Sequence, residues 1–206
     1  MTPLAEAGYR CIAIDIPPFG FSERPSTPSY GNKDQANRIV AMMDSLGIEH
    51  AMLLGHSFGG GATLETALMI PDRIAALVLL DVGGLNLNLQ PAPEDSSPSA
   101  LEIFLDTRAV RNPLLAATAT NPLFTKTLIS AMVLDPDDVT TEKTDIPQQP
   151  LVLQDATNTL GDWFKYVLTV QEPSLTTDPA NYKTLTMPTL IVWGDSDSII
   201  PLQEGE

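Results

Sequence analysis

The chain has 206 residues, 43% of them hydrophobic, and a formal net charge of −15 at pH 7. This length and apolar content suffice for a folded core and exclude an intrinsically disordered chain. The 11 Lys and Arg residues are scattered among 26 acidic ones, which argues against nucleic acids and anionic membranes as partners. No apolar run approaches the ~20 residues that span a bilayer, so we expect no membrane insertion.

Strand and helix patterns alternate in the first part of the chain. Residues 34–46 place apolar side chains at helical spacing and end before Gly47, which predicts a helix whose C-terminus uses positive φ. Residues 58–70 predict a second helix. Three short, mostly apolar runs predict buried strands, at 10–16, 51–54 and 75–80. This alternation is typical of a parallel sheet in an α/β fold.

The pattern then changes to helices and returns to a strand. A polar loop at 86–98 is followed by a capping-box spacing from Ser99 to Glu102. Helical segments are expected near 99–110, 122–133 and 150–170, and a buried strand at 189–193. We expect the apolar side chains of this helical region to be mainly core, at Leu101, Phe104, Leu105, Phe124, Leu128, Met132, Trp163, Phe164 and Val167. So large a helical insertion between strands is read as a lid.

Two side chains near the first predicted strand have structural interpretations. Cys11 is the single cysteine, so an internal disulfide is excluded and a buried, inert thiol is expected. Asp15 precedes the turn Pro17-Pro18-Phe19-Gly20 and is expected to hydrogen-bond its own turn.

The strongest motif is Gly55-His56-Ser57-Phe58-Gly59, which lies between a predicted strand and a predicted helix. On a sharp strand-to-helix turn, a serine can expose its hydroxyl only where neighbouring Cβ atoms are absent, which accounts for Gly55 and Gly59. Ser57 is therefore a candidate nucleophile. The alternative is a serine that belongs only to the turn.

Three motifs together resemble the α/β-hydrolase fold superfamily, in its lidded serine-hydrolase branch of esterases, carbon–carbon bond hydrolases and haloperoxidase-like enzymes. They are the strand and turn from Gly8 to Ser22, the turn from Gly55 to Gly60, and the segment from Pro188 to Pro201 with its G-x-x-D pattern. The resemblance implies a partial α/β-hydrolase fold, a mostly parallel sheet with a helical lid insertion. The implied division is 1–84 as the first part of the core, 85–186 as the lid and 187–206 as the second part of the core.

Carried over by position, the resemblance implies that Ser57 is the nucleophile and that Asp197 is the acid that orients a catalytic histidine. Phe58 would donate its backbone N–H to the oxyanion. Alternatives remain for the acid: Asp197 as an ordinary loop aspartate, Asp195 in the same turn, or Asp81 at the end of its strand. We expect Asp81 to fix the loop rather than to act in the triad.

The chain also departs from the family pattern. The resemblance calls for a histidine after a further strand, whereas the two histidines here, His50 and His56, do not fit: His56 should point away from the Ser57 hydroxyl and His50 starts the preceding strand. The strands that precede residue 10 in the family, and the loop with the second oxyanion donor, have no counterpart. We expect a fragment truncated at both ends, with a gap in the sheet beside residues 10–16. Pro18 replaces a usual glycine of the turn.

The expected function is a serine hydrolase that acts on a small ester or related carbonyl compound through a covalent serine intermediate. A serine rather than an aspartate at position 57 argues against the haloalkane dehalogenase and epoxide hydrolase branches. The alternative is an inactive fragment or a binding protein that lacks the triad histidine. No metal-ligand spacing and no phosphate-binding loop is present, so no cofactor is expected. Oligomeric state is left open, and localisation too, with the cytoplasm as the default because no signal segment is visible.

Overall fold

A computed structural model of the chain describes residues 1–24, 29–83, 99–169 and 173–205. In chain order the helices and strands are α1 (Thr2–Glu6), α2 (Asn32–Ser45), β1 (Ala51–His56), α3 (Ser57–Met69), β2 (Ile74–Val82), α4 (Ala100–Asp106), α5 (Arg108–Ala117), α6 (Pro122–Ser130), α7 (Thr141–Gln148), α8 (Ala156–Thr169) and β3 (Thr189–Val192). Short 3-10 helices lie at Pro71–Arg73, Pro136–Asp138, Gln149–Val152, Leu175–Thr177, Pro179–Thr184 and Leu202–Glu204. The polar loop expected at 86–98 lies outside the described residues.

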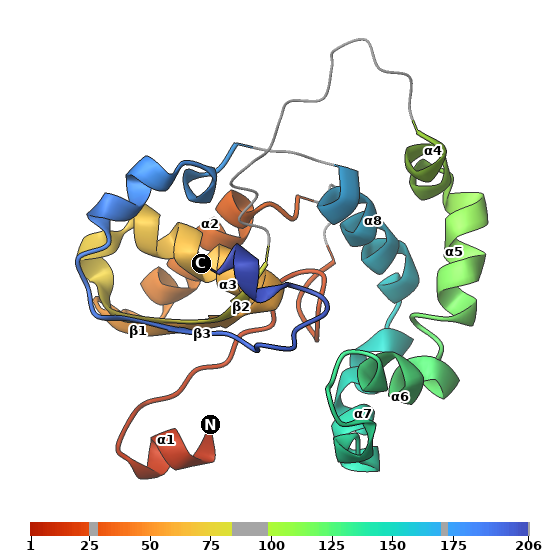
Figure 1. Ribbon diagram of the computed structural model, residues 1–206, viewed down its shortest axis with the longest axis horizontal. Helices are drawn as coiled ribbons and strands as arrows, with labels where there is room; N and C mark the ends of the chain where they lie inside the picture. The colour runs from red at the N-terminus through yellow and green to blue at the C-terminus, as the bar shows by residue number, and fades with distance from the viewer. Residues whose placement is uncertain (25–28, 84–98, 170–172, 206) are drawn as a thin grey trace.

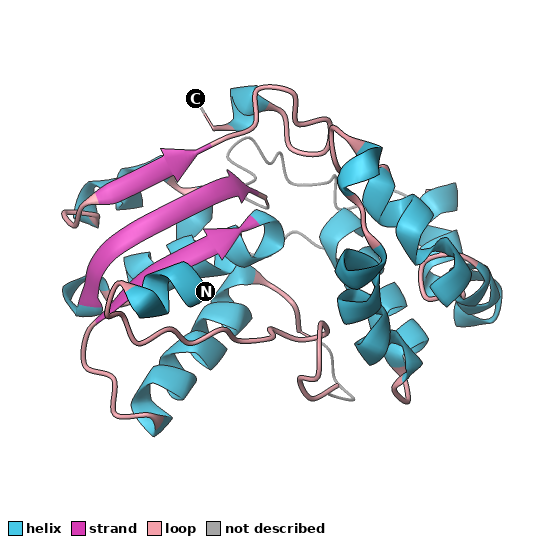
Figure 2. Cartoon of the chain, turned by 90° about the horizontal axis from the view of Figure 1, so that it is seen from below, coloured by secondary structure: helices cyan, strands magenta, loops and turns pink. Residues whose placement is uncertain are grey.

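The strands form a parallel sheet in the order β1-β2-β3. Leu54 pairs with Val78, which in turn pairs with Leu190. Figure 1 shows the sheet and its helices on one side of the molecule and the helices α4–α8 on the other; Figure 2 shows the three strands side by side. The predicted α/β class and parallel sheet are confirmed.

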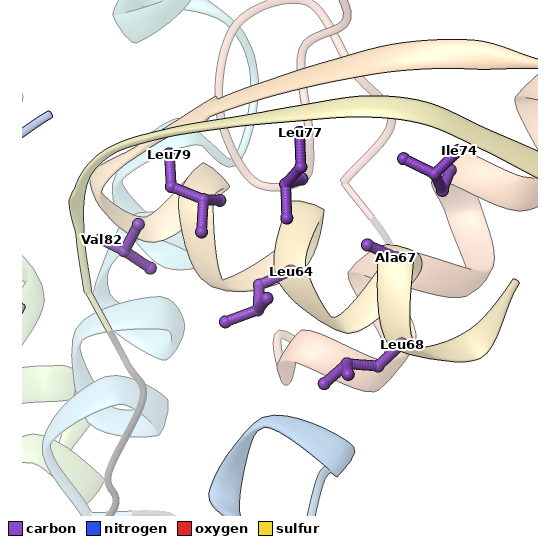
Figure 3. Packing of buried hydrophobic residues seen from close by; sticks show 7 residues of the cluster. All are labelled: Leu64, Ala67, Leu68, Ile74, Leu77, Leu79 and Val82. Atoms are coloured by element: carbon purple, nitrogen blue, oxygen red, sulfur yellow. The ribbon is translucent and has the colours of Figure 1, made fainter. Parts of the chain in front are cut away.

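The core lies between the sheet and α3. Helix α3 is buried along most of its length because its residues, apart from Glu65, are small or apolar on every side. Figure 3 shows Leu77 and Leu79 pointing from β2 toward α3; Leu64, Ala67 and Leu68 of this helix belong to the same cluster, and Ile74 and Val82 complete it. Helix α2 buries Ile39 and Met43 against Ala62 in a second cluster, and Gly47 ends it with φ +62°, as predicted.

Strands β1 and β2 are more buried on the face toward α3 than on the opposite face, and β3 is exposed along its whole length. Met52 and Leu54 of β1, together with Leu190 and Val192 of β3, are exposed. Because α2 and α3 both lie on the same side of the sheet, as Figure 1 shows, the opposite face has no helical cover among the described residues. The expectation of fully buried strands was therefore wrong for this face.

The strand predicted at residues 10–16 does not form. The segment carries no strand assignment, and Ile12 and Ile14 are exposed. A strand needs a neighbour for its backbone N–H and C=O groups, and no described strand pairs with this segment. Cys11 is accordingly half-buried rather than buried, with its Sγ 3.7 Å from the Tyr9 carbonyl oxygen.

Helices α4–α8 follow the three predicted segments with two differences. The first segment divides at Thr107 into α4 and α5, and α7 was not predicted. The capping box is confirmed: Glu102 N–H donates to Ser99 Oγ, and Ser99 N–H donates to the Glu102 carboxylate at 2.6 Å. The expected apolar core was largely wrong, because of the expected residues only Leu105 is buried, whereas five are exposed: Leu101, Phe124, Leu128, Met132 and Val167.

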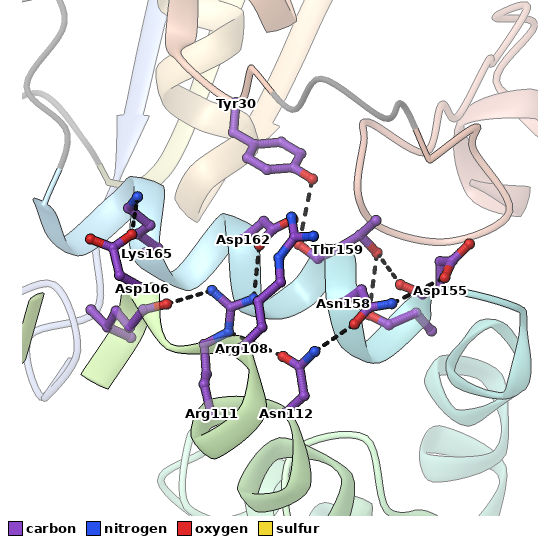
Figure 4. A network of polar contacts seen from close by, with 12 residues as sticks. Tyr30, Asp106, Arg108, Arg111, Asn112, Asp155, Asn158, Thr159, Asp162 and Lys165 are labelled. Atoms are coloured by element: carbon purple, nitrogen blue, oxygen red, sulfur yellow. Dashed lines mark hydrogen bonds and ion pairs between the residues drawn. The ribbon is translucent and has the colours of Figure 1, made fainter. Parts of the chain in front are cut away.

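A polar network takes the place of that core (Figure 4). Arg111 of α5 is 1% exposed and donates to Asp162 of α8 at 2.8 Å and to the Leu105 carbonyl at 2.6 Å. Arg108 donates to the other oxygen of Asp162 at 2.7 Å. An added Cβ at Gly161 would lie 2.4 Å from Arg111 Nε, so glycine leaves room for the guanidinium. No helix among the described residues has the length and apolar character needed to cross a membrane.

Candidate active site

The turn from β1 to α3 has the conformation that its motif predicts. Ser57 begins α3 directly after β1, with φ +52°, a left-handed backbone that is unusual for a residue with a side chain. The Ser57 carbonyl oxygen accepts from Gly83 N–H at 3.0 Å, which ties the turn to the end of β2. Strain of this kind persists only where the surrounding structure enforces it, and it concentrates at functional sites.

The glycines of this turn have different roles. An added Cβ at Gly55 would lie 2.4 Å from Thr63 Oγ1 and 2.7 Å from the Gly59 carbonyl, so β1 and α3 approach too closely for any side chain there. At Gly59 an added Cβ would meet nothing within 4 Å. The steric reason expected for Gly59 was therefore wrong in this structure. Close packing occurs instead at Gly61, where an added Cβ would lie 2.7 Å from both Asn32 Oδ1 and the Gly83 carbonyl oxygen.

Phe58 combines a free helix N-terminus with an aromatic contact. Its backbone N–H belongs to the first turn of α3 and so has no acceptor within the helix, which makes it suitable for negative charge. Its ring lies edge-on to Trp163 of α8, with 5.6 Å between centroids, and to Phe19 at 6.0 Å. Sequence reasoning placed Trp163 in a set expected to be mainly core, with one or two members lining a pocket, and did not foresee that α8 reaches the turn at Ser57.

The turn that carries Phe19 is held by Asp15, as predicted. Asp15 Oδ2 accepts from Phe21 N–H at 2.9 Å, and the Asp15 carbonyl accepts from the Ser22 hydroxyl. Gly20 has φ +57°, and an added Cβ there would come within 2.0 Å of the Asp15 carboxyl group. This closed turn places Phe19 beside Phe58.

Asp197 lies in the loop after β3, and its carboxylate accepts hydrogen bonds from backbone N–H groups of the same loop. Its Oδ1 accepts from Ile199 N–H at 2.7 Å and from Ile200 N–H at 2.9 Å. These backbone hydrogen bonds, first that of Ile200 and then that of Ile199, hold the pKa of Asp197 below its usual value, and the charge of nearby His56 acts in the same direction. Asp197 is therefore held as a carboxylate at neutral pH, near the C-terminal edge of the sheet.

Asp81 links the loop after β3 to the strand before it. Its Oδ1 accepts from Gly194 N–H at 2.7 Å, and its backbone has φ +41°. This bond agrees with the expectation that Asp81 fixes the loop. Its Oδ2 lies 3.8 Å from His56 Nε2. The fold thus gathers His56, Asp81 and Asp197 beside the turn that holds Ser57.

The two histidines and Asp195 do not pair with the Ser57 hydroxyl. The side chain of His56 is 64% exposed and faces Asp81, and His50 precedes β1 at the end opposite Ser57. Among the described residues the Ser57 hydroxyl has no hydrogen-bond partner, and no group of three His, Cys, Asp or Glu side chains could hold a metal ion. Asp195 accepts from the Ser196 hydroxyl at 3.1 Å.

Glu65 was missed by sequence reasoning. It is 1% exposed in α3, and its carboxylate accepts from Leu175 N–H at 3.0 Å and Thr176 N–H at 2.9 Å. The available signal was a single charged residue inside an otherwise apolar helix. Its bonds hold the segment that returns from α8 to the sheet.

Comparison with known proteins gives consistent results. A family model described as alpha/beta hydrolase fold matches residues 1–206. An uncharacterized hydrolase of Bacillus subtilis (strain 168), YugF, is 26% identical over 99% of this chain and 69% of its own length. The 2-hydroxymuconate semialdehyde hydrolase of Pseudomonas sp. (strain CF600) is 28% identical over 94% of this chain and 62% of its own length. The bromoperoxidase of Bacillus anthracis shares the fold, with a TM-score of 0.69 at 20% identity over 98% of this chain and 69% of that one. The chain thus spans 62% to 69% of the length of these proteins.

Proposed function

The chain belongs to the α/β-hydrolase fold family, and on that premise we propose that it is a serine hydrolase acting on a small carbonyl compound. The observation that carries the proposal is the left-handed backbone of Ser57 at the junction of β1 and α3. This conformation suits a nucleophile because it lifts the hydroxyl out of the strand and sets it at a helix N-terminus.

In the proposed mechanism the Ser57 hydroxyl gives its proton to a general base as Oγ bonds to the carbonyl carbon of the substrate. The bond from that carbon to the leaving group then breaks, the leaving group takes up the proton, and the acyl group remains on Ser57 as a covalent intermediate. The Phe58 N–H donates to the oxygen on which negative charge develops. Asp197 is the acid partner of the general base; its support is its carboxylate form and its place near the Ser57 turn. Water then bonds to the acyl carbon, the bond from that carbon to Ser57 Oγ breaks, and Oγ regains a proton through the base, which releases the acid.

The bond cleaved is proposed to be a carbon–carbon or ester bond beside that carbonyl. The relative named a 2-hydroxymuconate semialdehyde hydrolase supports the carbon–carbon case. The division into core (1–84 and 187–206) and lid (85–186) remains part of the proposal. The edge-on contact of Trp163 with Phe58 supports a lid role for α8.

A second candidate is a catalytically inactive binding protein. The observation that favours it is that neither His50 nor His56 hydrogen-bonds Ser57 within the residues described. A chain without the histidine lacks the general base of the triad, and loss of one triad member removes most of the rate acceleration.

A fluorophosphonate probe separates these candidates, because it labels a serine activated as a nucleophile. We expect labelling of the 206-residue chain and of Ser196→Ala, a control on the loop near Asp197, and no labelling of Ser57→Ala. A wild-type chain that stays unlabelled although its circular dichroism shows that it is folded would contradict the hydrolase and favour the binding protein. Where turnover of an ester is measurable, Ser57→Ala should lower it by several orders of magnitude.

A further inference from the structure

The indole N–H of Trp163 is a buried donor without an acceptor. Its Nε1 is inaccessible to solvent and has no hydrogen-bond partner within the described part of the chain. The surrounding rings belong to Phe19, Phe58 and Phe164, with centroids 5.0, 5.6 and 5.0 Å away. Phenyl rings offer no oxygen or nitrogen acceptor. A buried donor without a partner is unfavourable, and proteins keep few of them.

The second tryptophan shows that the fold can satisfy this group. Trp193 Nε1 donates to the Ile200 carbonyl oxygen at 2.9 Å. The unpaired indole is the one whose ring contacts Phe58, the residue that follows Ser57 and whose backbone N–H is proposed to hold the oxyanion. The ring that carries the unpaired donor therefore packs beside the residue that follows Ser57.

We propose that Trp163 positions the substrate by donating its Nε1–H to a second oxygen of the bound compound. The inference rests on the proposed function. The Phe58 amide holds the oxygen of the carbonyl under attack, and Trp163 binds another oxygen close to it. The three phenyl rings contact an apolar flank of the compound. The substrate class is a carbonyl compound with an aromatic or other apolar group and a neighbouring oxygen acceptor.

The first test compares two esters that differ at one position. Methyl benzoylformate carries an oxo group beside the ester carbonyl, and methyl phenylacetate carries a methylene there. Trp163→Phe keeps an aromatic ring and removes the N–H, so kcat/KM should fall about tenfold for methyl benzoylformate and less than twofold for methyl phenylacetate. Trp193→Phe removes the same atom from an indole that already has an acceptor, the Ile200 carbonyl, and should change both esters equally. Equal losses for the two esters in Trp163→Phe would show a packing role and overturn the proposal.

The second test measures binding on the unsubstituted Trp163 indole; a Trp163→Phe variant serves only to assign its signal. In Ser57→Ala labelled with ¹⁵N, the two indole N–H signals are assigned from the signal missing in each Trp→Phe variant. Methyl benzoylformate should move the Trp163 signal downfield and leave the Trp193 signal in place, whereas methyl phenylacetate should move neither downfield. A Trp163 signal that responds to neither ester, or to both alike, overturns the proposal. Equal turnover by wild type and Ser57→Ala would instead refute the serine hydrolase, independently of the indole signal.

Discussion

The sheet with α2 and α3, and the helices α4–α8, are held together in different ways. In the first region apolar side chains from α3 and β2 fill the core, as Leu64 and Leu77 do in Figure 3. In the second region the largest fully buried side chain is Arg111, and many apolar residues of its helices are exposed. The comparison shows that a helical region without a large apolar core can be organised around one satisfied cation.

The apolar core and the polar network differ in what a substitution leaves behind. Removing atoms from an apolar core loses contacts and leaves a cavity. Removing Arg111 leaves the Leu105 carbonyl and one oxygen of Asp162 buried without their donor. The apolar region should therefore lose stability according to the volume removed, and the polar region according to the partners left unpaired.

The largest effect is expected in the apolar core. Leu77→Ala should lower the free energy of unfolding by about 4 kcal/mol, because the side chain is 1% exposed between β2 and α3. Leu123→Ala is the matched control in α6, where the side chain is 86% exposed, and should change it by less than about 0.5 kcal/mol. Denaturant unfolding measures both. A cost at Leu123 comparable with that at Leu77 would mean that α6 is covered in solution.

A somewhat smaller effect is expected in the polar network. Arg111→Met should cost about 3 kcal/mol, less than a fully broken buried pair, because Asp162 keeps its bond to Arg108. Lys165→Met is the control: it removes the pair with Asp106, whose side chains are 40% and 58% exposed, and should cost about 0–1 kcal/mol. Hydrogen exchange should show lost protection in α5 and α8 while β1 and β2 stay protected. Equal loss in β1 would mean that the two regions unfold together.

The smallest effect at neutral pH is expected at Tyr30, which connects the regions. Tyr30 is fully buried; its hydroxyl donates to the Thr159 carbonyl in α8 at 3.4 Å, and its ring contacts Tyr166. Tyr30→Phe should cost about 0.5–1 kcal/mol at pH 8. Burial first, and then the charge of Asp162, raise the pKa of Tyr30 from 10.0 to about 12. The folded state thus holds this proton more tightly than the unfolded chain does.

The stabilisation by Tyr30 is therefore fully present below pH 10 and is lost as the pH rises from 10 to 12. Absorbance at 295 nm should show one tyrosine that titrates near pH 12 in the wild type and is missing in Tyr30→Phe. Unfolding midpoints should fall more steeply between pH 10 and 12 in the wild type than in the variant. Identical slopes would contradict the raised pKa.

Several helices and the turn at Ser57 could be predicted because the signals that specify them are local. The apolar periodicity of residues 34–46, Gly47, the Ser99 capping box and the Gly55-to-Gly59 motif each depend on interactions within a few residues. The structure reproduces the conformations that they predict. The α/β class followed from the alternation of strand and helix patterns, and the family resemblance from the motifs at 8–22, 55–60 and 188–201.

The tertiary structure decided whatever depends on distant partners. Residues 10–16 have the composition of a strand and remain unpaired, because a strand exists only beside another. The exposure of Leu54 depends on which face of the sheet the helices cover. Trp163 reaches Phe58, and Asp81 holds Gly194, only because the chain returns across the C-terminal edge of the sheet. Sequence patterns alone determined local conformation, whereas contacts between remote segments depend on where the folded chain brings them together.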